Sequence, residues 1–294
     1  MRSLLFVPGD SDKKLQKGLG SGADAVIVDL EDSVAPTNKK VARETAAAFL
    51  AEARADDAPL IFVRVNDFST GLTDDDLAAV VAGRPDGIML PKATGGADVA
   101  RLSTKLRVHE AEAGLQDGAI SILPLITETG AGLLAAGSYT PDLPRLSGLT
   151  WGAEDLSADI GARSARDESG RFTDVFRLAR SMTLLAAAAA ETPAIDTVFV
   201  DYRALDALEA ECVEAERDGF TGKLAIHPAQ VPVINAAFTP SVEAVAEAEA
   251  IVAAFAGAGD VGVVGIDGKM FDRPHLRRAE RLLARARAAR RADG

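Results

Sequence analysis

Eight short apolar runs recur along the chain, and segments with helical periodicity separate most of them. The runs are nearly continuous stretches of Val, Ile, Leu and Ala, which is typical of parallel strands buried on both faces. Amphipathic segments fill the intervals, among them 38–53, 74–82, 96–113 and 173–190. The eight runs lie at residues 4–7, 25–30, 60–65, 87–90, 120–125, 146–151, 197–200 and 224–226.

This alternation predicts an α/β fold, a (β/α)8 TIM barrel formed by residues 1–240. A doubly wound parallel sheet is the alternative, but it usually has a GxGxxG turn after the first strand, and VPGDSDKK at 7–14 lacks one. Residues 241–294 continue with a helical pattern at 241–256, a Gly-rich stretch and a basic helical pattern at 274–291. We expect them to form a C-terminal helical extension.

The amino-acid composition argues against several classes of protein. A net charge of −12 argues against binding to nucleic-acid phosphates, which requires a basic surface. The single cysteine, Cys212, excludes an intramolecular disulfide and Cys-rich metal centres, and its helical context predicts a buried structural position. No run reaches the roughly 20 apolar residues of a membrane span, and the N-terminal run is too short for a signal peptide. We expect a cytoplasmic protein without nucleic-acid or membrane partners.

Polar side chains follow the predicted strands, and the carboxyl ends of TIM-barrel strands form the active site. Because His and Cys are scarce there, the oxygen ligands suit a hard cation, Mg²⁺ or alternatively Mn²⁺. Glu128 and Asp155 follow adjacent strands and can reach one ion, while Arg64 can bind a carboxylate or an enolate. The charged residues at the strand ends include Asp10, Asp29, Glu31, Asp32, Arg64, Asp67, Lys92, Glu128, Asp155, Asp201 and His227.

Several segments together resemble the HpcH/HpaI aldolase superfamily, in the branch of citrate lyase β subunits and malyl-CoA lyases. They include FVRVND, IMLPKA, LITETG, WGAEDLSADIG and GKMFDRPHLRRAERLL, and the similarity spans nearly the whole chain. The resemblance implies that Glu128 in ITETG and Asp155 in GAEDL bind the metal and that Arg64 in VRVN binds substrate. It also implies that Asp272 in GKMFDRP serves as an acid and base in the active site of a neighbouring subunit, within a homotrimer or higher homo-oligomer.

The activity implied by the resemblance is Mg²⁺-dependent cleavage of a β-hydroxyacyl-CoA thioester, of the malyl-CoA or citramalyl-CoA type, to acetyl-CoA and a 2-oxo acid. Coenzyme A would enter as part of the substrate, and Lys13 and Lys14 after the first strand are candidate contacts for its phosphates. Three alternatives stay open: a citrate lyase β subunit acting on a carrier-protein thioester, a class II aldolase acting on free 2-oxo acids, and a metal-binding barrel without catalysis. Lys92 also leaves a Schiff-base aldolase open.

Overall fold

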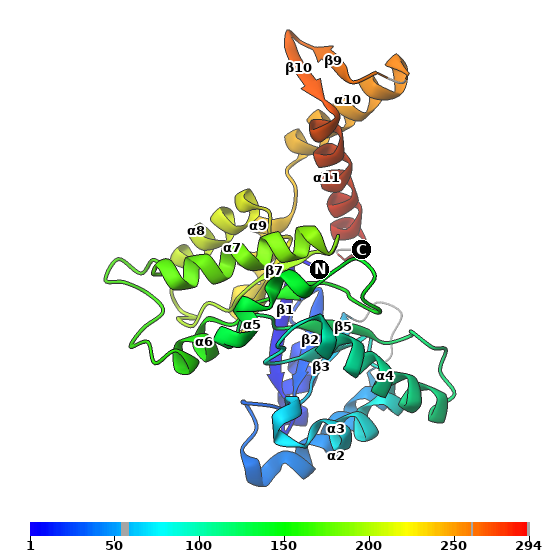
Figure 1. Ribbon diagram of the computed structural model, residues 1–294, viewed down its shortest axis with the longest axis vertical. Helices are drawn as coiled ribbons and strands as arrows, with labels where there is room; N and C mark the ends of the chain where they lie inside the picture. The colour runs from blue at the N-terminus through cyan, green and yellow to red at the C-terminus, as the bar shows by residue number, and fades with distance from the viewer. Residues whose placement is uncertain (54–58, 260, 293–294) are drawn as a thin grey trace.

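The main sheet is a nearly closed barrel of eight parallel strands in the order β5-β4-β3-β2-β1-β8-β7-β6 (Figure 1). It is seen in a computed structural model that describes residues 1–53, 59–259 and 261–292. Parallel bridges from Ile122 to Leu146 and from Leu125 to Thr150 join the two end strands. The predicted TIM barrel is therefore confirmed. Its strands are β1 (Ser3–Pro8), β2 (Ala25–Asp29), β3 (Leu60–Arg64), β4 (Gly87–Leu90), β5 (Ser121–Pro124), β6 (Leu149–Thr150), β7 (Ala194–Asp196) and β8 (Gly222–Ala225).

Helices connect the strands and cover the outside of the barrel. The expected intervals 38–53, 96–113 and 173–190 agree with α2, α4 and α7 to within one residue at each end. None of the helices in the described ranges is long and apolar enough to cross a membrane. The barrel helices are α1 (Asp12–Leu19), α2 (Lys39–Glu52), α3 (Thr73–Val80), α4 (Gly96–Glu112), α5 (Gly130–Leu134), α6 (Ala153–Asp159), α7 (Asp174–Ala189), α8 (Leu205–Asp218) and α9 (Val231–Phe238).

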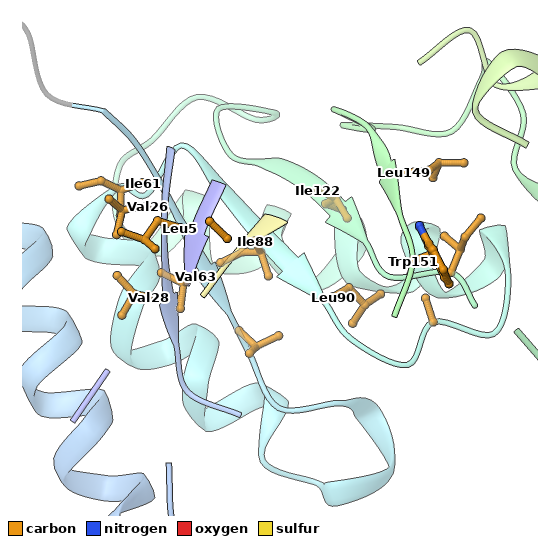
Figure 2. Close-up of a cluster of buried hydrophobic side chains, with 14 of the residues drawn as sticks. Leu5, Val26, Val28, Ile61, Val63, Ile88, Leu90, Ile122, Leu149 and Trp151 are labelled. Carbon is orange, nitrogen blue, oxygen red and sulfur yellow. The ribbon is translucent and has the colours of Figure 1, made fainter. Parts of the chain in front are cut away.

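Both faces of the strands are buried, because successive side chains point alternately into the barrel and towards the helices. The larger core lies between the strands and the helices, and Figure 2 shows part of it around Val26, Ile88 and Trp151. The barrel interior is filled by a second cluster that includes Leu4, Ala25, Ile27, Phe62, Met89, Leu123, Leu125, Ile195 and Leu224. Burial on both faces explains why the strands read as continuous apolar runs.

The position of the seventh strand was predicted wrongly. It was expected at 197–200, whereas β7 is Ala194–Asp196 and pairs with β6 and β8. The segment PAIDTVFV is apolar over most of its length, so composition alone does not show where the strand ends. Val200 is 54% exposed, and Asp201 lies in an exposed loop rather than at a strand end. Asp196 is the acid that ends this strand.

The C-terminal elements form an arm, residues 242–292, that projects from the barrel (Figure 1). It consists of α10 (Val242–Ala258), β9 (Val263–Ile266), β10 (Lys269–Asp272) and α11 (Arg273–Ala292). The arm has its own apolar cluster, in which Phe255, Phe271 and Leu283 are buried. The β9–β10 hairpin was not expected, although Asp267 and Gly268 have φ of 47° and 75°, the conformation that favours an Asp-Gly hairpin turn. Residues 260, 293 and 294 of the expected extension lie outside the described residues.

Candidate active site at the carboxyl ends of the strands

Six charged side chains meet at the carboxyl ends of β2 to β6, and we call this group the barrel mouth. The strands run parallel and in register, so that Pro8 pairs with Asp29 and Asp29 pairs with Arg64. Residues that follow neighbouring strands therefore emerge at the same end of the barrel. The barrel mouth consists of Asp29, Glu31, Arg64, Lys92, Glu128 and Asp155.

Arg64 is held by two acids. Its Nε and Nη2 donate to the two carboxylate oxygens of Asp29, each at 2.7 Å, and its Nη1 lies 2.9 Å from Oε2 of Glu31. The ring of Phe6 lies 4.7 Å from the guanidinium carbon. Burial alone would raise the pKa of Asp29, but the hydrogen bonds and charge of Arg64 hold it below its usual value. Arg64 therefore presents a fixed positive charge at the barrel mouth.

Lys92 links the remaining acids. It follows β4 with φ of 51°, a left-handed conformation that is costly for a residue with a side chain. In this conformation its backbone N–H donates to Oε2 of Glu128 at 2.5 Å. Its ammonium contacts Glu31 and lies 3.2 Å from Oδ1 of Asp155 and 3.4 Å from Oδ2 of Asp32. The strained backbone therefore lets the N–H of Lys92 contact Glu128 while its ammonium contacts Glu31 and Asp155.

The contacts of the Lys92 ammonium decide whether Lys92 can form a Schiff base. Burial alone would lower the pKa of Lys92, but the hydrogen bond and charge of Glu31, together with Asp155, raise it. A Schiff base requires a neutral amine as nucleophile. The arrangement keeps Lys92 as an ammonium ion and argues against this role.

Glu128 is a buried carboxylate beside other acids. It is 2% exposed, and burial, followed by the charges of Asp155 and Glu31, raises its pKa well above the usual value. Gly152, which precedes α6, leaves the space that Glu128 occupies, because a Cβ there would lie 2.7 Å from Cγ of Glu128. Asp155 stands in the first turn of α6 with 28% of its side chain exposed. The structure thus brings Glu128, Asp155 and Arg64 into one charged group.

The oxygen ligands at the barrel mouth fit a hard cation. Glu128 and Asp155 both contact Lys92, and a cation near them would neutralise a buried carboxylate that is otherwise costly. Among the residues that the structure describes, no group of three or more His, Cys, Asp or Glu is arranged to hold a metal. Mg²⁺ is commonly bound by two carboxylates, while water and substrate occupy its other coordination positions.

Asp272 does not join this group within one chain. It ends β10 at the far end of the arm, and Figure 1 shows this hairpin well away from the barrel strands. Its Oδ1 instead lies 2.5 Å from Nδ1 of His275. Lys13 and Lys14 are exposed in the first turn of α1, directly after β1 and therefore at the barrel mouth end.

His227 and Cys212 have structural surroundings. His227 precedes the short 3-10 helix Pro228–Gln230, and its Nδ1 accepts a hydrogen bond from the backbone N–H of Ala229 at 3.1 Å. Its ring stacks on Tyr202 with centroids 4.6 Å apart. Cys212 is buried, as expected, and burial raises its pKa to about 12.

A buried ionic network behind β7 and β8 was missed. Lys223 is fully buried on β8, and its Nζ lies 2.9 Å from both Asp196 and Glu211. Asp196 also accepts from Nε1 of Trp151 at 2.8 Å and from Arg180. Burial would raise the pKa of Asp196, but the charges of Lys223 and Arg180 lower it to about 2. The lysine inside the strand sequence GKLA was the signal, since a buried lysine requires a partner.

Comparison with known proteins identifies relatives over nearly the whole chain. A profile of the family HpcH/HpaI aldolase/citrate lyase matches residues 2–228. A (3S)-malyl-CoA thioesterase of Cereibacter sphaeroides is 35% identical over 291 residues, which cover 98% of this chain and 95% of the relative. A mitochondrial citramalyl-CoA lyase of Rattus norvegicus is 32% identical over 297 residues, covering 97% and 86%.

Solved structures with the same architecture include CitE of Mycobacterium tuberculosis in complex with magnesium, acetoacetate and coenzyme A. It has a TM-score of 0.74 and 34% identity, and the match covers 97% of this chain and 99% of CitE. RipC of Yersinia pestis has a TM-score of 0.66 and 32% identity, covering 83% of this chain and 97% of RipC. Similarity to CitE thus includes the arm as well as the barrel.

Proposed function

Because the chain belongs to the HpcH/HpaI aldolase/citrate lyase family, we propose that it cleaves a malyl-CoA or citramalyl-CoA type thioester to acetyl-CoA and a 2-oxo acid. Membership of the family, and with it the class of carbon–carbon lyase, agrees with the sequence prediction. The observation that carries the proposed reaction is the grouping of Glu128, Asp155 and Arg64 at the barrel mouth.

In this proposal Glu128 and Asp155 hold the metal. Bound Mg²⁺ would act as a Lewis acid that polarises the carbonyl and carboxylate oxygens of the 2-oxo acid. The magnesium and coenzyme A in the CitE complex support both groups as ligands of this family. Mn²⁺ prefers similar oxygen ligands and is the alternative ion. Lys13 and Lys14, exposed beside the barrel mouth, are proposed contacts for the coenzyme A phosphates.

Arg64 is proposed to stabilise the thioester enolate. Its guanidinium has five N–H groups. Three nitrogens face Asp29 and Glu31, which leaves one hydrogen on Nη1 and one on Nη2 for a substrate oxygen. A donor fixed in advance stabilises developing negative charge without reorganising during the reaction. The ion pair with Asp29 therefore supports catalysis by keeping Arg64 in place.

Asp272 is proposed to transfer the proton at the thioester carbon. In cleavage, the substrate hydroxyl gives its proton to a water molecule, the carbon–carbon bond breaks and its electron pair forms the enolate. The carboxylic acid of Asp272 then gives a proton to the enolate carbon, and in condensation the carboxylate takes it back. Because the arm holds Asp272 away from its own barrel strands, we propose that a neighbouring subunit supplies it, in a homotrimer or higher homo-oligomer.

The reaction is tested by its products. The purified protein is incubated with malyl-CoA or citramalyl-CoA, in Mg²⁺ or in EDTA, and the released 2-oxo acid is measured as its hydrazone. We expect release of the 2-oxo acid in Mg²⁺ and none in EDTA. Activity only on a carrier-protein thioester would indicate a citrate lyase β subunit. Activity only on free 2-oxo acids would indicate a class II aldolase.

Thioester hydrolysis is a second candidate, favoured by the relatives named (3S)-malyl-CoA thioesterase. Hydrolysis of malyl-CoA would release the free coenzyme A thiol and a hydroxy acid, without a 2-oxo acid. A thiol reagent added to the same reactions separates the two activities. Thiol release without 2-oxo acid would replace the lyase proposal, and 2-oxo acid without thiol would exclude hydrolysis.

A further inference from the structure

The junction between β10 and α11 brings Asp272 and His275 together. Asp272 directly precedes the first residue of α11, and His275 is the third residue of that helix. Nδ1 of His275 lies 2.5 Å from Oδ1 of Asp272, and the backbone N–H of His275 lies 3.4 Å from the same oxygen. The backbone N–H of Asp272 also points at Nδ1, at 3.3 Å.

In this contact, Nδ1 of His275 can act either as a hydrogen-bond acceptor or as a hydrogen-bond donor. In a capping box, Nδ1 would accept the Asp272 backbone N–H and serve only to begin the helix. A ring nitrogen cannot donate and accept at once. The shorter contact is the one to the carboxylate, which accepts hydrogen bonds and does not donate them, so it assigns the proton to Nδ1. His275 therefore donates to Asp272.

The ring of His275 and the second carboxylate oxygen of Asp272 differ in their surroundings. The imidazole of His275 packs edge-on against Phe271, with centroids 5.5 Å apart and planes at 85°, and Phe271 is buried in the apolar cluster of the arm. The ring is thus anchored. Within the described residues, Oδ2 of Asp272 has no hydrogen-bond partner, while Oδ1 is occupied. About half of the Asp272 side chain is exposed, which leaves Oδ2 accessible.

We propose that His275 is a positioning residue that fixes the Asp272 carboxylate and leaves Oδ2 as the oxygen that exchanges the proton with the thioester carbon. The inference rests on the proposed role of Asp272. An exposed aspartate otherwise samples several rotamers, and holding a catalytic group in one geometry contributes directly to rate. The hydrogen bond from His275 also lowers the pKa of Asp272, because it favours the charged carboxylate, which is the form that takes the proton in condensation.

Two substitutions separate positioning from helix capping. Glutamine and glutamate are both favourable at the third position of a helix, so both preserve the cap. Only glutamine has a side-chain N–H that can donate to Asp272. We expect His275→Gln to stay within about threefold of the wild-type kcat, and His275→Glu to lose about 10- to 100-fold in kcat with little change in KM.

A double-mutant cycle shows whether the effect passes through Asp272. In the Asp272→Asn background, His275→Glu should lower the residual kcat less than about twofold further, because the group it positions is gone. His109→Gln, a change of another histidine on the remote helix α4, is the matched control. Thermal unfolding and oligomer size are measured for every variant. If His275→Glu unfolds early, His275→Leu provides a second variant without a donor.

The outcomes are distinct. Equal kcat in His275→Gln and His275→Glu would confine His275 to helix capping and overturn the inference. A further loss from His275→Glu in the Asp272→Asn background would also overturn it, since the effect would not act through Asp272. Wild-type turnover of Asp272→Asn alone would remove the proposed acid–base role, and the positioning role with it. Loss in Asp272→Asn with full activity in His275→Glu would overturn only the inference.

Discussion

Arg64 and Asp29 form a two-pronged ion pair between neighbouring strands, with Nε–Oδ1 and Nη2–Oδ2 both at 2.7 Å. The pair is fixed because the two residues end β3 and β2 in register. We predict that Asp29→Asn lowers kcat about 10- to 100-fold, because asparagine can accept only one of the two hydrogen bonds and frees the guanidinium to turn. Steady-state kinetics measure this loss.

The ion pair between Arg145 and Glu110 provides the control for Asp29→Asn. Arg145 binds both oxygens of Glu110 at 2.6 and 2.7 Å, and Glu110 also accepts the backbone N–H of Ile120 just before β5. This is the amino end of the strand, away from the barrel mouth. Glu110→Gln should therefore lower the free energy of unfolding by about 1–3 kcal/mol and leave kcat unchanged. Wild-type kcat in Asp29→Asn would contradict the role given to Arg64.

Gly152→Ala tests the position of Glu128. The added methyl group would lie 2.7 Å from Cγ and 2.9 Å from Oε1 of Glu128, so the carboxylate must move. We predict that Mg²⁺ affinity, measured by titration calorimetry, falls at least about tenfold, as for changes around other metal sites. Gly137→Ala is the control, because nothing lies within 4 Å of its added Cβ. Equal Mg²⁺ affinity in both variants would separate Glu128 from the metal.

The state of Lys92 is tested by borohydride trapping. Its ammonium is held by Glu31 and Asp155, and a charged amine does not attack a carbonyl. We predict that sodium borohydride with pyruvate leaves the mass of the protein unchanged and its activity intact. A reduced adduct on the peptide that contains Lys92 would instead establish a Schiff-base mechanism.

The ionic network behind β7 and β8 predicts a pH dependence of stability. Asp196 has a folded-state pKa of about 2, below the roughly 3.9 of an unfolded aspartate. Its contribution of roughly 2 kcal/mol is therefore complete above about pH 5 and is lost as the pH falls through 4 towards 2. Urea unfolding between pH 6 and 2.5 should show a shallower decline for Asp196→Asn than for the wild type. Parallel pH curves would contradict this assignment.

Much of the barrel could be predicted because its strands are buried on both faces and its helices have one apolar face. The seventh strand could not be placed by this signal, since apolar residues continue beyond Asp196 and only pairing with β6 and β8 ends it. The hairpin around Asp267 and Gly268 was missed because it belongs to a Gly-rich stretch with little periodicity.

Some residues of the candidate site could be predicted from the sequence and others could not. Glu128, Asp155 and Arg64 could be grouped because residues at the ends of neighbouring parallel strands must lie close together. The central place of Lys92 could not, because it depends on a left-handed backbone conformation that its sequence does not indicate. The pairing of Lys223 with Asp196 depends on contacts between distant segments, which no local pattern encodes.

In the proposed function, one active site combines Glu128 and Asp155 of one subunit with Asp272 of another. To test this arrangement, Glu128→Gln and Asp272→Asn chains are co-expressed with different tags, and the mixed oligomers are purified through both tags. Each variant alone should retain only a small residual activity. Mixed oligomers should regain 2-oxo acid release, because some sites then receive an intact barrel mouth and an intact arm. Mixed oligomers as inactive as either variant would contradict it.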